Sequence, residues 1–236
     1  MQWHAKKADG TGRDTSRSTL WVLPVLLVGS LTAAAPLQAQ GGREHRQVRP
    51  FSPEDLGLLE GPDREAWQRP DQVMDALGIA DGSTVADLGA GGGWFTVRLA
   101  RRVGPNGIVY AEDIQQQMID SITRRVGREG LNNVRFKLGT ADDPDLPAGL
   151  LDAALMVDIY HEVEQKVELL RNVKRALKPT GRLGVVNYTK DGGGPGPAMD
   201  VRIDPQVVIE DARAAGLRLL THETFLPYQY LLIFGN

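Results

Sequence analysis

Short apolar runs alternate with amphipathic segments along the chain from Pro70 onward. Apolar runs bounded by turn residues predict strands over 83–88, 107–113, 133–138, 151–158 and 181–188. Apolar positions at helical spacing predict helices over 70–77, 94–103, 114–126 and 165–177. Strands and helices that alternate in this way predict a parallel sheet covered by helices on both faces.

The pattern changes near the C-terminus, where one helix is followed by two strands with no helix between them. The helix is expected over 204–216, and the strands lie within 217–234 on either side of a turn at Leu226 and Pro227. A terminal hairpin makes one strand near the edge of the sheet antiparallel. The expected fold class is therefore α/β, a doubly wound sheet that is mostly parallel with a C-terminal antiparallel hairpin.

The first residues carry a different pattern, in which basic residues precede a long uncharged run. The run reads LWVLPVLLVGSLTAAAPLQA from Leu20, and the basic residues before it are Lys6, Lys7, Arg13 and Arg17. Small residues before Gln40 suit a cleavage site, so we predict a signal peptide over 1–39 and a periplasmic or secreted protein. An uncleaved N-terminal membrane anchor is the alternative, because the two patterns are alike.

Residues 40–68 are expected to form an arm or linker, and residues 69–236 a single domain. The 236 residues are 42% hydrophobic and 24% charged, which suits one ordinary domain. Without the leader the net charge of −3 becomes about −5, which argues against a nucleic-acid partner. The absence of cysteine excludes disulfides and a Cys-based zinc site. No membrane span is expected in the mature protein unless the leader remains.

A glycine-rich turn follows the first predicted strand in the sequence VADLGAGGGWF, residues 85–95. The dinucleotide pattern G-x-G-x-x-G fails in both registers, because Trp94 or Thr96 stands at the last position. A phosphate-binding loop also fails, since no lysine follows the glycines. The Asp87 carboxylate would repel a pyrophosphate and attract a cation. The turn therefore favours a positively charged ligand over the dinucleotide of a dehydrogenase.

Asp87, Gly89, Gly91 and Gly93 resemble the D-x-G-x-G-x-G motif of the class I S-adenosylmethionine-dependent methyltransferases. The resemblance extends over about Arg69 to Phe234. It implies a Rossmann-like, seven-stranded sheet, S-adenosylmethionine as cofactor, and cofactor contacts from the turn, Ala90 included. The alternative is a structural glycine turn in some other doubly wound protein.

Two acids end the second predicted strand. In the resembled family an acid here accepts hydrogen bonds from the ribose hydroxyls, and the family phrase V-Y-A-x-D matches Asp113, with Glu112 the second choice and Ile114 beside them. The alternative is that these acids cap the following helix. After the third strand, the family places an acid against the adenine amine.

The adenine loop of this chain departs from the family pattern, because Thr140 stands where many relatives have an acid. The resemblance then gives the role to Asp142, with Ala141 beside it, or else to Asp143. An ordinary Asp/Pro turn is the alternative.

The fourth strand leads into VDIYHEVE, residues 157–164, which places the candidate catalytic residues His161, Asp158 and Tyr160 near the predicted cofactor site. If the acceptor is a hydroxyl or an acidic carbon, a base must take its proton, and His161 is the first candidate. Asp158 is expected to touch both cofactor and acceptor. The alternative for His161 is a capping or packing role. Gln165 breaks the H-E-x-x-H pattern, so no metal site is expected.

The chain is therefore expected to be an exported S-adenosylmethionine-dependent methyltransferase with a small-molecule acceptor. The alternative is a catalytically inactive module that binds S-adenosylmethionine or S-adenosylhomocysteine as a sensor or interaction partner. The glycine- and proline-rich segment 190–202 is either a lid over the acceptor or a surface connection. Trp94, Tyr160 and Tyr188 are pocket or core residues near the same edge.

Overall fold

The structure is a computed structural model that describes residues 51–52, 57 and 61–236. The chain divides into two units, Met1–Glu44 and His45–Asn236, and the first of them lies outside the described residues. The predicted signal peptide and its cleavage site fall in that undescribed part. Within the described residues, no helix is both long enough and apolar enough to cross a membrane.

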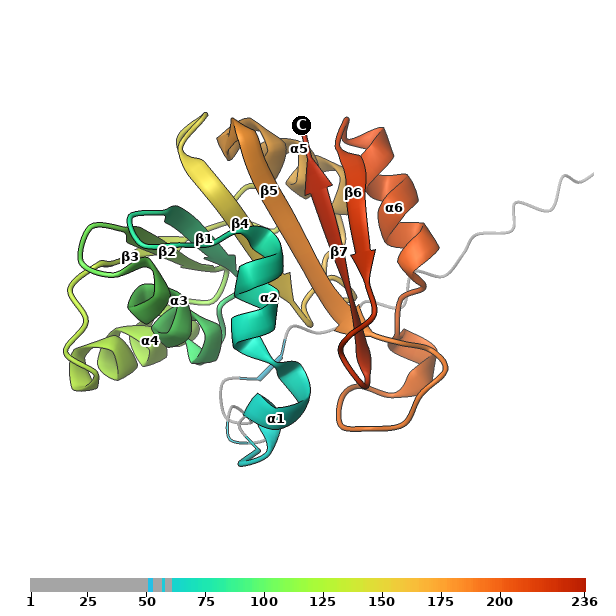
Figure 1. Cartoon of the computed structure of the whole chain (residues 1–236), viewed down its shortest axis with the longest axis horizontal. Coiled ribbons are helices and arrows are strands. Elements are labelled where there is room, and N and C mark those ends of the chain that lie inside the picture. Colours follow the sequence, from blue (N-terminus) through green and yellow to red (C-terminus); the bar gives the residue numbers. More distant parts are fainter. Residues whose placement is uncertain (1–50, 53–56, 58–60) are drawn as a thin grey trace, which may run out of the picture. The chain divides into compact units, whose positions relative to one another are not determined.

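A seven-stranded sheet with the order β3-β2-β1-β4-β5-β7-β6 forms the centre of the second unit (Figure 1). The strands from β1 to β5 pair in parallel, and β7 is antiparallel to both β5 and β6. This confirms the expected mostly parallel sheet with a C-terminal antiparallel hairpin. The strands are β1 (Thr84–Leu88), β2 (Ile108–Asp113), β3 (Val134–Leu138), β4 (Leu151–Val157), β5 (Leu177–Tyr188), β6 (Arg218–Glu223) and β7 (Gln229–Gly235).

Helices cover both faces of the sheet. One core contains side chains of α2, α3 and α4 packed on the strands, and the other contains side chains of α5 and α6. Figure 1 shows these helices around the sheet. Burial on both faces explains why the central strands are almost continuously apolar. The helices are α1 (Arg64–Gln68), α2 (Pro70–Leu77), α3 (Trp94–Val103), α4 (Gln116–Arg128), α5 (Lys166–Ala176) and α6 (Pro205–Ala214), with a 3-10 turn η2 (Met199–Val201).

Local sequence signals set several helix ends. Pro70 opens α2 and Gly78, in the left-handed conformation, ends it. Asp204 caps α6, where its side chain accepts a hydrogen bond from the Gln206 amide. Gly93 adopts a φ of 78° immediately before α3, which an L side chain would strain.

The elements differ from the prediction by one or two residues at several ends, and more clearly in the following places. Strand β5 begins at Leu177 rather than at residue 181, because Leu177 pairs with Leu151 of β4 across an irregularity in the ladder. Helix α4 begins at Gln116 rather than at Ile114, because Gln115 is extended and its amide donates to the Asp113 carboxylate. Helix α1 lies in the span expected to be an arm, and its last residue, Gln68, is buried.

Candidate functional site

The strand order reverses between β1 and β4, which are neighbours although β2 and β3 lie between them in sequence. Ligands of open α/β sheets bind beyond the carboxyl ends of the strands at such a reversal. The glycine turn follows β1 and Asp158 follows β4, so both lie at this point. The candidate site is built from these two segments and the ends of β2, β3, β5 and β7.

The glycine turn is tied to the end of β2 by its own backbone. Gly89 and Gly91 have φ values of 65° and 54°. The Gly91 amide donates to Asp113 Oδ2 at 2.9 Å, and the Gly89 amide donates to Glu112 Oε2 at 3.3 Å. The Ala90 amide donates to the Glu112 carbonyl at 2.8 Å. Each amide between Gly89 and Gly91 therefore points at the predicted ribose acids.

Asp87 contacts the helix that follows the turn. Its side chain is buried, and Oδ2 accepts a hydrogen bond of 2.6 Å from the Thr96 hydroxyl in the first turn of α3. Burial raises the pKa of Asp87 to about 6, although the Thr96 hydrogen bond lowers it. The carboxylate therefore fixes the turn against α3, and it is charged at neutral pH as the predicted cation contact requires.

Glu112 and Asp113 are each 5% exposed and lie on opposite faces of β2. Burial is the main cause that raises the pKa of Glu112 to about 8, and the nearby acids Asp113 and Asp87 add to it. Burial also raises the pKa of Asp113, against the amides of Gln115 and Gly91 that donate to it. At neutral pH the side chain of Glu112 is therefore protonated.

Two large apolar side chains are exposed beside these acids. Ile114, directly after β2, is 45% exposed, and Leu138, the last residue of β3, is 51% exposed. Exposed apolar side chains of this size at the carboxyl edge of the sheet suit the flat apolar face of the adenine that the sequence predicts there. Ile114 was a predicted cofactor residue, whereas Leu138 was missed, because its strand showed only an ordinary apolar run.

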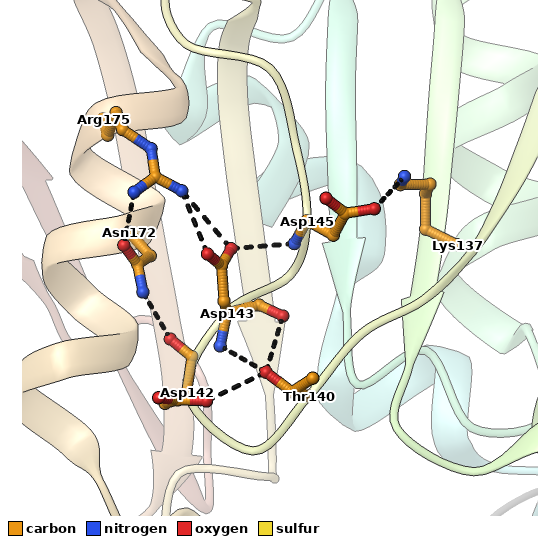
Figure 2. Close-up of polar contacts among 7 residues, drawn as sticks. All are labelled: Lys137, Thr140, Asp142, Asp143, Asp145, Asn172 and Arg175. Atoms are coloured by element: carbon orange, nitrogen blue, oxygen red, sulfur yellow. Dashed lines mark hydrogen bonds and ion pairs between the residues drawn. The ribbon is translucent and has the colours of Figure 1, made fainter.

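The predicted adenine loop is held from helix α5, as Figure 2 shows. The Asn172 side chain donates to the Asp142 carbonyl at 2.8 Å, and Arg175 forms an ion pair of 3.1 Å with Asp143. The Thr140 hydroxyl donates to Asp142 Oδ1 at 2.9 Å. The Asp143 carboxylate is therefore already paired with Arg175. Of the two candidates for the adenine contact, Asp142 has the carboxylate with fewer contacts.

Asp158 is the centre of a hydrogen-bond network at the end of β4. The Gln229 side chain donates to both of its carboxylate oxygens, at 2.7 and 2.8 Å, and the Gln68 side chain donates at 3.2 Å. Burial raises the pKa of Asp158 to about 7, against the charge of Arg64. The residue has a φ of 60°, which is unusual for a side chain of this kind.

Sequence reasoning missed Gln68 and Gln229. Both are almost completely buried, and they come from α1 and from the start of β7. The two amides also bond to each other at 3.1 Å. A glutamine far from every motif carries no signal of such a role, and only the sheet order brings these two to Asp158.

The position of Tyr160 differs from its predicted catalytic role. Its side chain is fully buried in the core under α5 and α6, and its hydroxyl donates to Asp211 Oδ2 of α6 at 2.8 Å. A catalytic role for Tyr160 does not fit this position, because the hydroxyl is already paired inside the protein. The chain turns directly after β4, where Asp158 adopts a φ of 60°, and the turn carries Tyr160 into the core while Asp158 stays at the end of the strand.

The His161 side chain is 14% exposed, and Nε2 lies 3.8 Å from Glu162 Oε1. Burial lowers the pKa of His161 below its ordinary value of 6.5, and the nearby Lys166 cation lowers it further. The imidazole is therefore neutral at pH 7 and able to accept a proton. Glu162 also accepts a hydrogen bond of 3.0 Å from the Phe51 amide.

The segment 190–202 after β5, predicted to be either a lid over the acceptor or a surface connection, is held in place by Arg202. This buried guanidinium donates to the carbonyls of Thr189, Gly192 and Pro197 at 2.8 to 3.1 Å. The segment therefore has a defined path beside the site.

Comparison with known proteins agrees with this geometry. Residues 85–181 match the family model of a methyltransferase domain. A ubiquinone/menaquinone biosynthesis C-methyltransferase UbiE from Pasteurella multocida is 35% identical over 130 residues, which cover 52% of this chain and 46% of that protein. The chain spans about half the length of the curated relatives it matches.

Solved structures give the same result. A SAM dependent methyltransferase from Aquifex aeolicus superposes with a TM-score of 0.75 at 27% identity, covering 78% of this chain and 98% of that one. The [4+2]-cyclase SpnF superposes with a TM-score of 0.58 at 26% identity, covering 67% of this chain and 59% of that one. From the family model, the sequence similarity and the superposition, residues 85–181 form a methyltransferase domain, and the fold is that of the S-adenosylmethionine-dependent methyltransferases, whose methyl donor is S-adenosylmethionine.

Proposed function

We propose that this protein transfers a methyl group from S-adenosylmethionine to a small-molecule acceptor, and that it does so outside the cytoplasm. The observation that carries the first part is the pairing of the Gly89 and Gly91 amides with Glu112 and Asp113. This pairing places bare backbone and two acids at the point where the sheet order reverses.

The residues at this point fit the cofactor. Asp113 and Glu112 provide acceptors for two ribose hydroxyls, and Ile114 and Leu138 provide an exposed apolar surface for adenine. Asp142 provides an acceptor for the adenine amine beside Ala141. Asp87 and Asp158 add negative charge near the glycine turn, which complements a cationic ligand. Gly93 supports the turn where α3 begins.

Bound S-adenosylmethionine supplies a methyl group on a sulfonium that is already a good leaving group. The protein then has to position the acceptor, exclude water and, for a hydroxyl or carbon acceptor, remove a proton. His161 suits the last task, because its imidazole is neutral at pH 7. Asp158 holds its place on the acceptor side through the two glutamines.

Calorimetry tests the cofactor assignment. We expect the purified protein to bind S-adenosylmethionine and S-adenosylhomocysteine but not NAD. Binding of NAD alone would refute the proposal. Binding of the first two with no methyl transfer to any acceptor would instead favour the inactive module, and the name of the cyclase SpnF shows that a similar fold also serves another reaction.

A His161→Ala variant tests the base. With an acceptor that supports formation of S-adenosylhomocysteine, we expect the rate to fall roughly a hundredfold while S-adenosylmethionine affinity stays nearly unchanged. His222→Ala is the matched control, because His222 is exposed on β6. An unchanged rate in the His161 variant would show that positioning alone is sufficient.

Export is supported by the basic residues and the uncharged run of the first 39 residues. An uncleaved leader would make the protein membrane-anchored instead. Because the cofactor is made in the cytoplasm, an exported enzyme needs a supply of it from there. The UbiE name of the relatives adds the expectation of a carbon acceptor.

A further inference from the structure

Residues 51–52 of the N-terminal arm, which we call the strap, contact two loops at the carboxyl edge of the sheet. The Phe51 amide donates to Glu162 Oε2 at 3.0 Å, and the Phe51 carbonyl accepts a hydrogen bond of 3.0 Å from the Gln115 side chain. Glu162 lies in the loop after β4, and Gln115 lies in the loop after β2. Both backbone polar groups of Phe51 are therefore paired, each with a different loop.

The sheet order shows what the strap bridges. Strand β1 lies between β2 and β4, so a residue bonded to the loops after both of these strands bridges the space beyond the end of β1. The glycine turn begins there, at Gly89, and both residues of the strap are half-buried. The strap precedes the matched methyltransferase domain, residues 85–181, so it is an addition to that domain.

On the β2 side, one residue connects the strap to the proposed ribose acid. The Gln115 backbone amide donates to Asp113 Oδ1 at 2.9 Å, while the side chain of the same residue holds the Phe51 carbonyl. The strap is therefore only one side chain away from the carboxylate that is expected to bind the ribose hydroxyls.

On the β4 side, the strap is fastened next to the proposed base. Glu162 directly follows His161, and its Oε1 lies 3.8 Å from His161 Nε2. Burial is the main cause that raises the pKa of Glu162; the Phe51 hydrogen bond lowers it, and the charge of Asp113 raises it further. Because a charge acts strongly only at short range, Glu162 and Asp113 border the same space.

The chemistry of S-adenosylmethionine indicates which part of it would lie under the strap. Its sulfonium is attached to the 5′ carbon of the ribose. A cofactor whose ribose bonds to Asp113 and whose methyl group is directed toward the side of His161 has its sulfonium between these two residues. The strap spans the same interval, and the carboxyl groups of Asp113 and Glu162 complement a cation there.

The way in which the strap is fastened allows it to open. Both of the bonds described above are made by loop side chains, not by the ladder of a sheet or the backbone of a helix. Such contacts open more readily than secondary structure does. A cover that opens admits the cofactor, and when closed it slows the release of the cofactor and excludes water.

We propose that the strap closes over bound S-adenosylmethionine and retains it in the site, with Gln115 and Glu162 as the two side chains that fasten it. This rests on the proposed methyltransferase function and adds a binding element from outside the matched domain. Gln115 and Glu162 act through the Phe51 backbone, so they are positioning residues. The strap then determines how long the cofactor stays bound.

The first test measures the release of tritiated S-adenosylhomocysteine from the purified protein after a chase with excess unlabelled ligand. We expect Gln115→Met and Glu162→Ala each to speed release about fivefold, because each variant loses one hydrogen bond to Phe51, and to change the association rate little. The double variant should release the ligand no faster than the faster single variant, because either loss opens the same strap.

Two variants serve as matched controls. Glu162→Gln should release the ligand at nearly the wild-type rate, because its amide oxygen still accepts from the Phe51 amide. Gln116→Met should also be unchanged, since the Gln116 side chain bonds to Asp120 of its own helix. A direct effect of the Glu162 charge on the ligand would instead make Glu162→Gln as fast as Glu162→Ala.

The second test uses chymotrypsin, which cleaves the peptide bond after Phe51. If the strap closes over the ligand, saturating S-adenosylhomocysteine should slow cleavage at this bond severalfold in the wild-type protein and much less in Gln115→Met. Mass spectrometry of the fragments measures the cleavage at this bond separately from cleavage elsewhere. This measurement depends on neither an acceptor nor turnover.

The outcomes separate the two proposals. If S-adenosylhomocysteine does not bind the wild-type protein, the proposed function and the strap both fail. If it binds, but release is unchanged in Gln115→Met and Glu162→Ala, the strap is wrong and the methyltransferase function stands. Faster cleavage after Phe51 in the presence of the ligand would also overturn the strap, because it would show that the ligand displaces this segment.

Discussion

At the scale of single residues, the site depends on acids that are held in a poorly solvated place. Burial raises the pKa of Asp87 to about 6, that of Asp158 to about 7 and that of Glu112 to about 8. Each carboxyl group therefore binds its proton more tightly in the folded protein than in the unfolded chain. The site costs the domain stability at neutral pH, and a bound cation would recover part of it.

This gives a prediction on pH and stability. Between its ordinary pKa of 4.5 and about 8, Glu112 keeps its proton only in the folded state. The free energy of unfolding should therefore fall as pH rises through this window, by at most about 1.4 kcal/mol per pH unit from this residue, and should level off above it. Glu112→Gln should show a shallower decline and be the more stable protein at pH 8.

Urea denaturation at pH 5.5, 7 and 8.5 measures this difference. Glu168→Gln is the control, because the side chain of Glu168 on α5 is 45% exposed. Parallel slopes for wild type and Glu112→Gln would show that Glu112 is ionised at neutral pH.

The glycine turn gives a second prediction at this scale. Gly91 has a φ of 54°, which valine adopts only with strain of about 1 to 3 kcal/mol. Gly91→Val should therefore lower S-adenosylmethionine affinity at least tenfold, because the side chain also stands where backbone meets ligand. Calorimetry measures it, with Gly127→Ala as control, since nothing lies within 4 Å of a side chain there. Unchanged S-adenosylmethionine affinity in a folded Gly91→Val protein would contradict the cofactor assignment.

At the scale of elements, helix α5 shapes a loop that it does not belong to. Arg175 and Asn172 hold Asp143 and the Asp142 carbonyl, and so set the path of the adenine loop (Figure 2). The loop contains a residue with a φ of 51°, Asp145, and an ion pair from Lys137 steadies it from β3. Two neighbouring elements therefore fix a loop of polar residues that has no core of its own.

Arg175→Ala should lower S-adenosylmethionine affinity about two- to fivefold, because a half-exposed ion pair contributes little more than about 1 kcal/mol. The melting temperature should change little. Arg171→Ala is the matched control, since Arg171 on the same helix pairs with Glu168. Arg175→Lys should restore part of the affinity. Equal effects of Arg175→Ala and Arg171→Ala would show that the loop needs no support from α5.

At the scale of the whole molecule, the predicted leader and the proposed cofactor point to different compartments, because the leader predicts export and S-adenosylmethionine is made in the cytoplasm. The leader predicts removal of residues 1–39 and export, so intact protein from the cell envelope should begin at or near Gln40. Mass spectrometry of the intact protein decides this. A full-length protein found in the cytoplasm would refute export and would also remove the difficulty of cofactor supply.

The sequence by itself determined the order and type of nearly every element. Helix α3 and the start of α2 lie at the predicted residues, because proline, glycine and apolar spacing act over a few positions. The glycine turn and the acids at the end of β2 were also visible in the sequence, because each is a short motif at the carboxyl end of a strand, and parallel strands bring such ends to one edge of the sheet. These local signals were sufficient for the fold class and for the family.

Only the tertiary structure decided which distant side chains share the site. Gln68 and Gln229 reach Asp158, and Trp67 reaches Tyr188, because β7 inserts beside β5 and α1 packs at their ends. Tyr160, only two residues from Asp158, is instead buried in the core that contains side chains of α5 and α6. Contacts of this kind depend on the order of strands in space, and no short stretch of sequence carries that order.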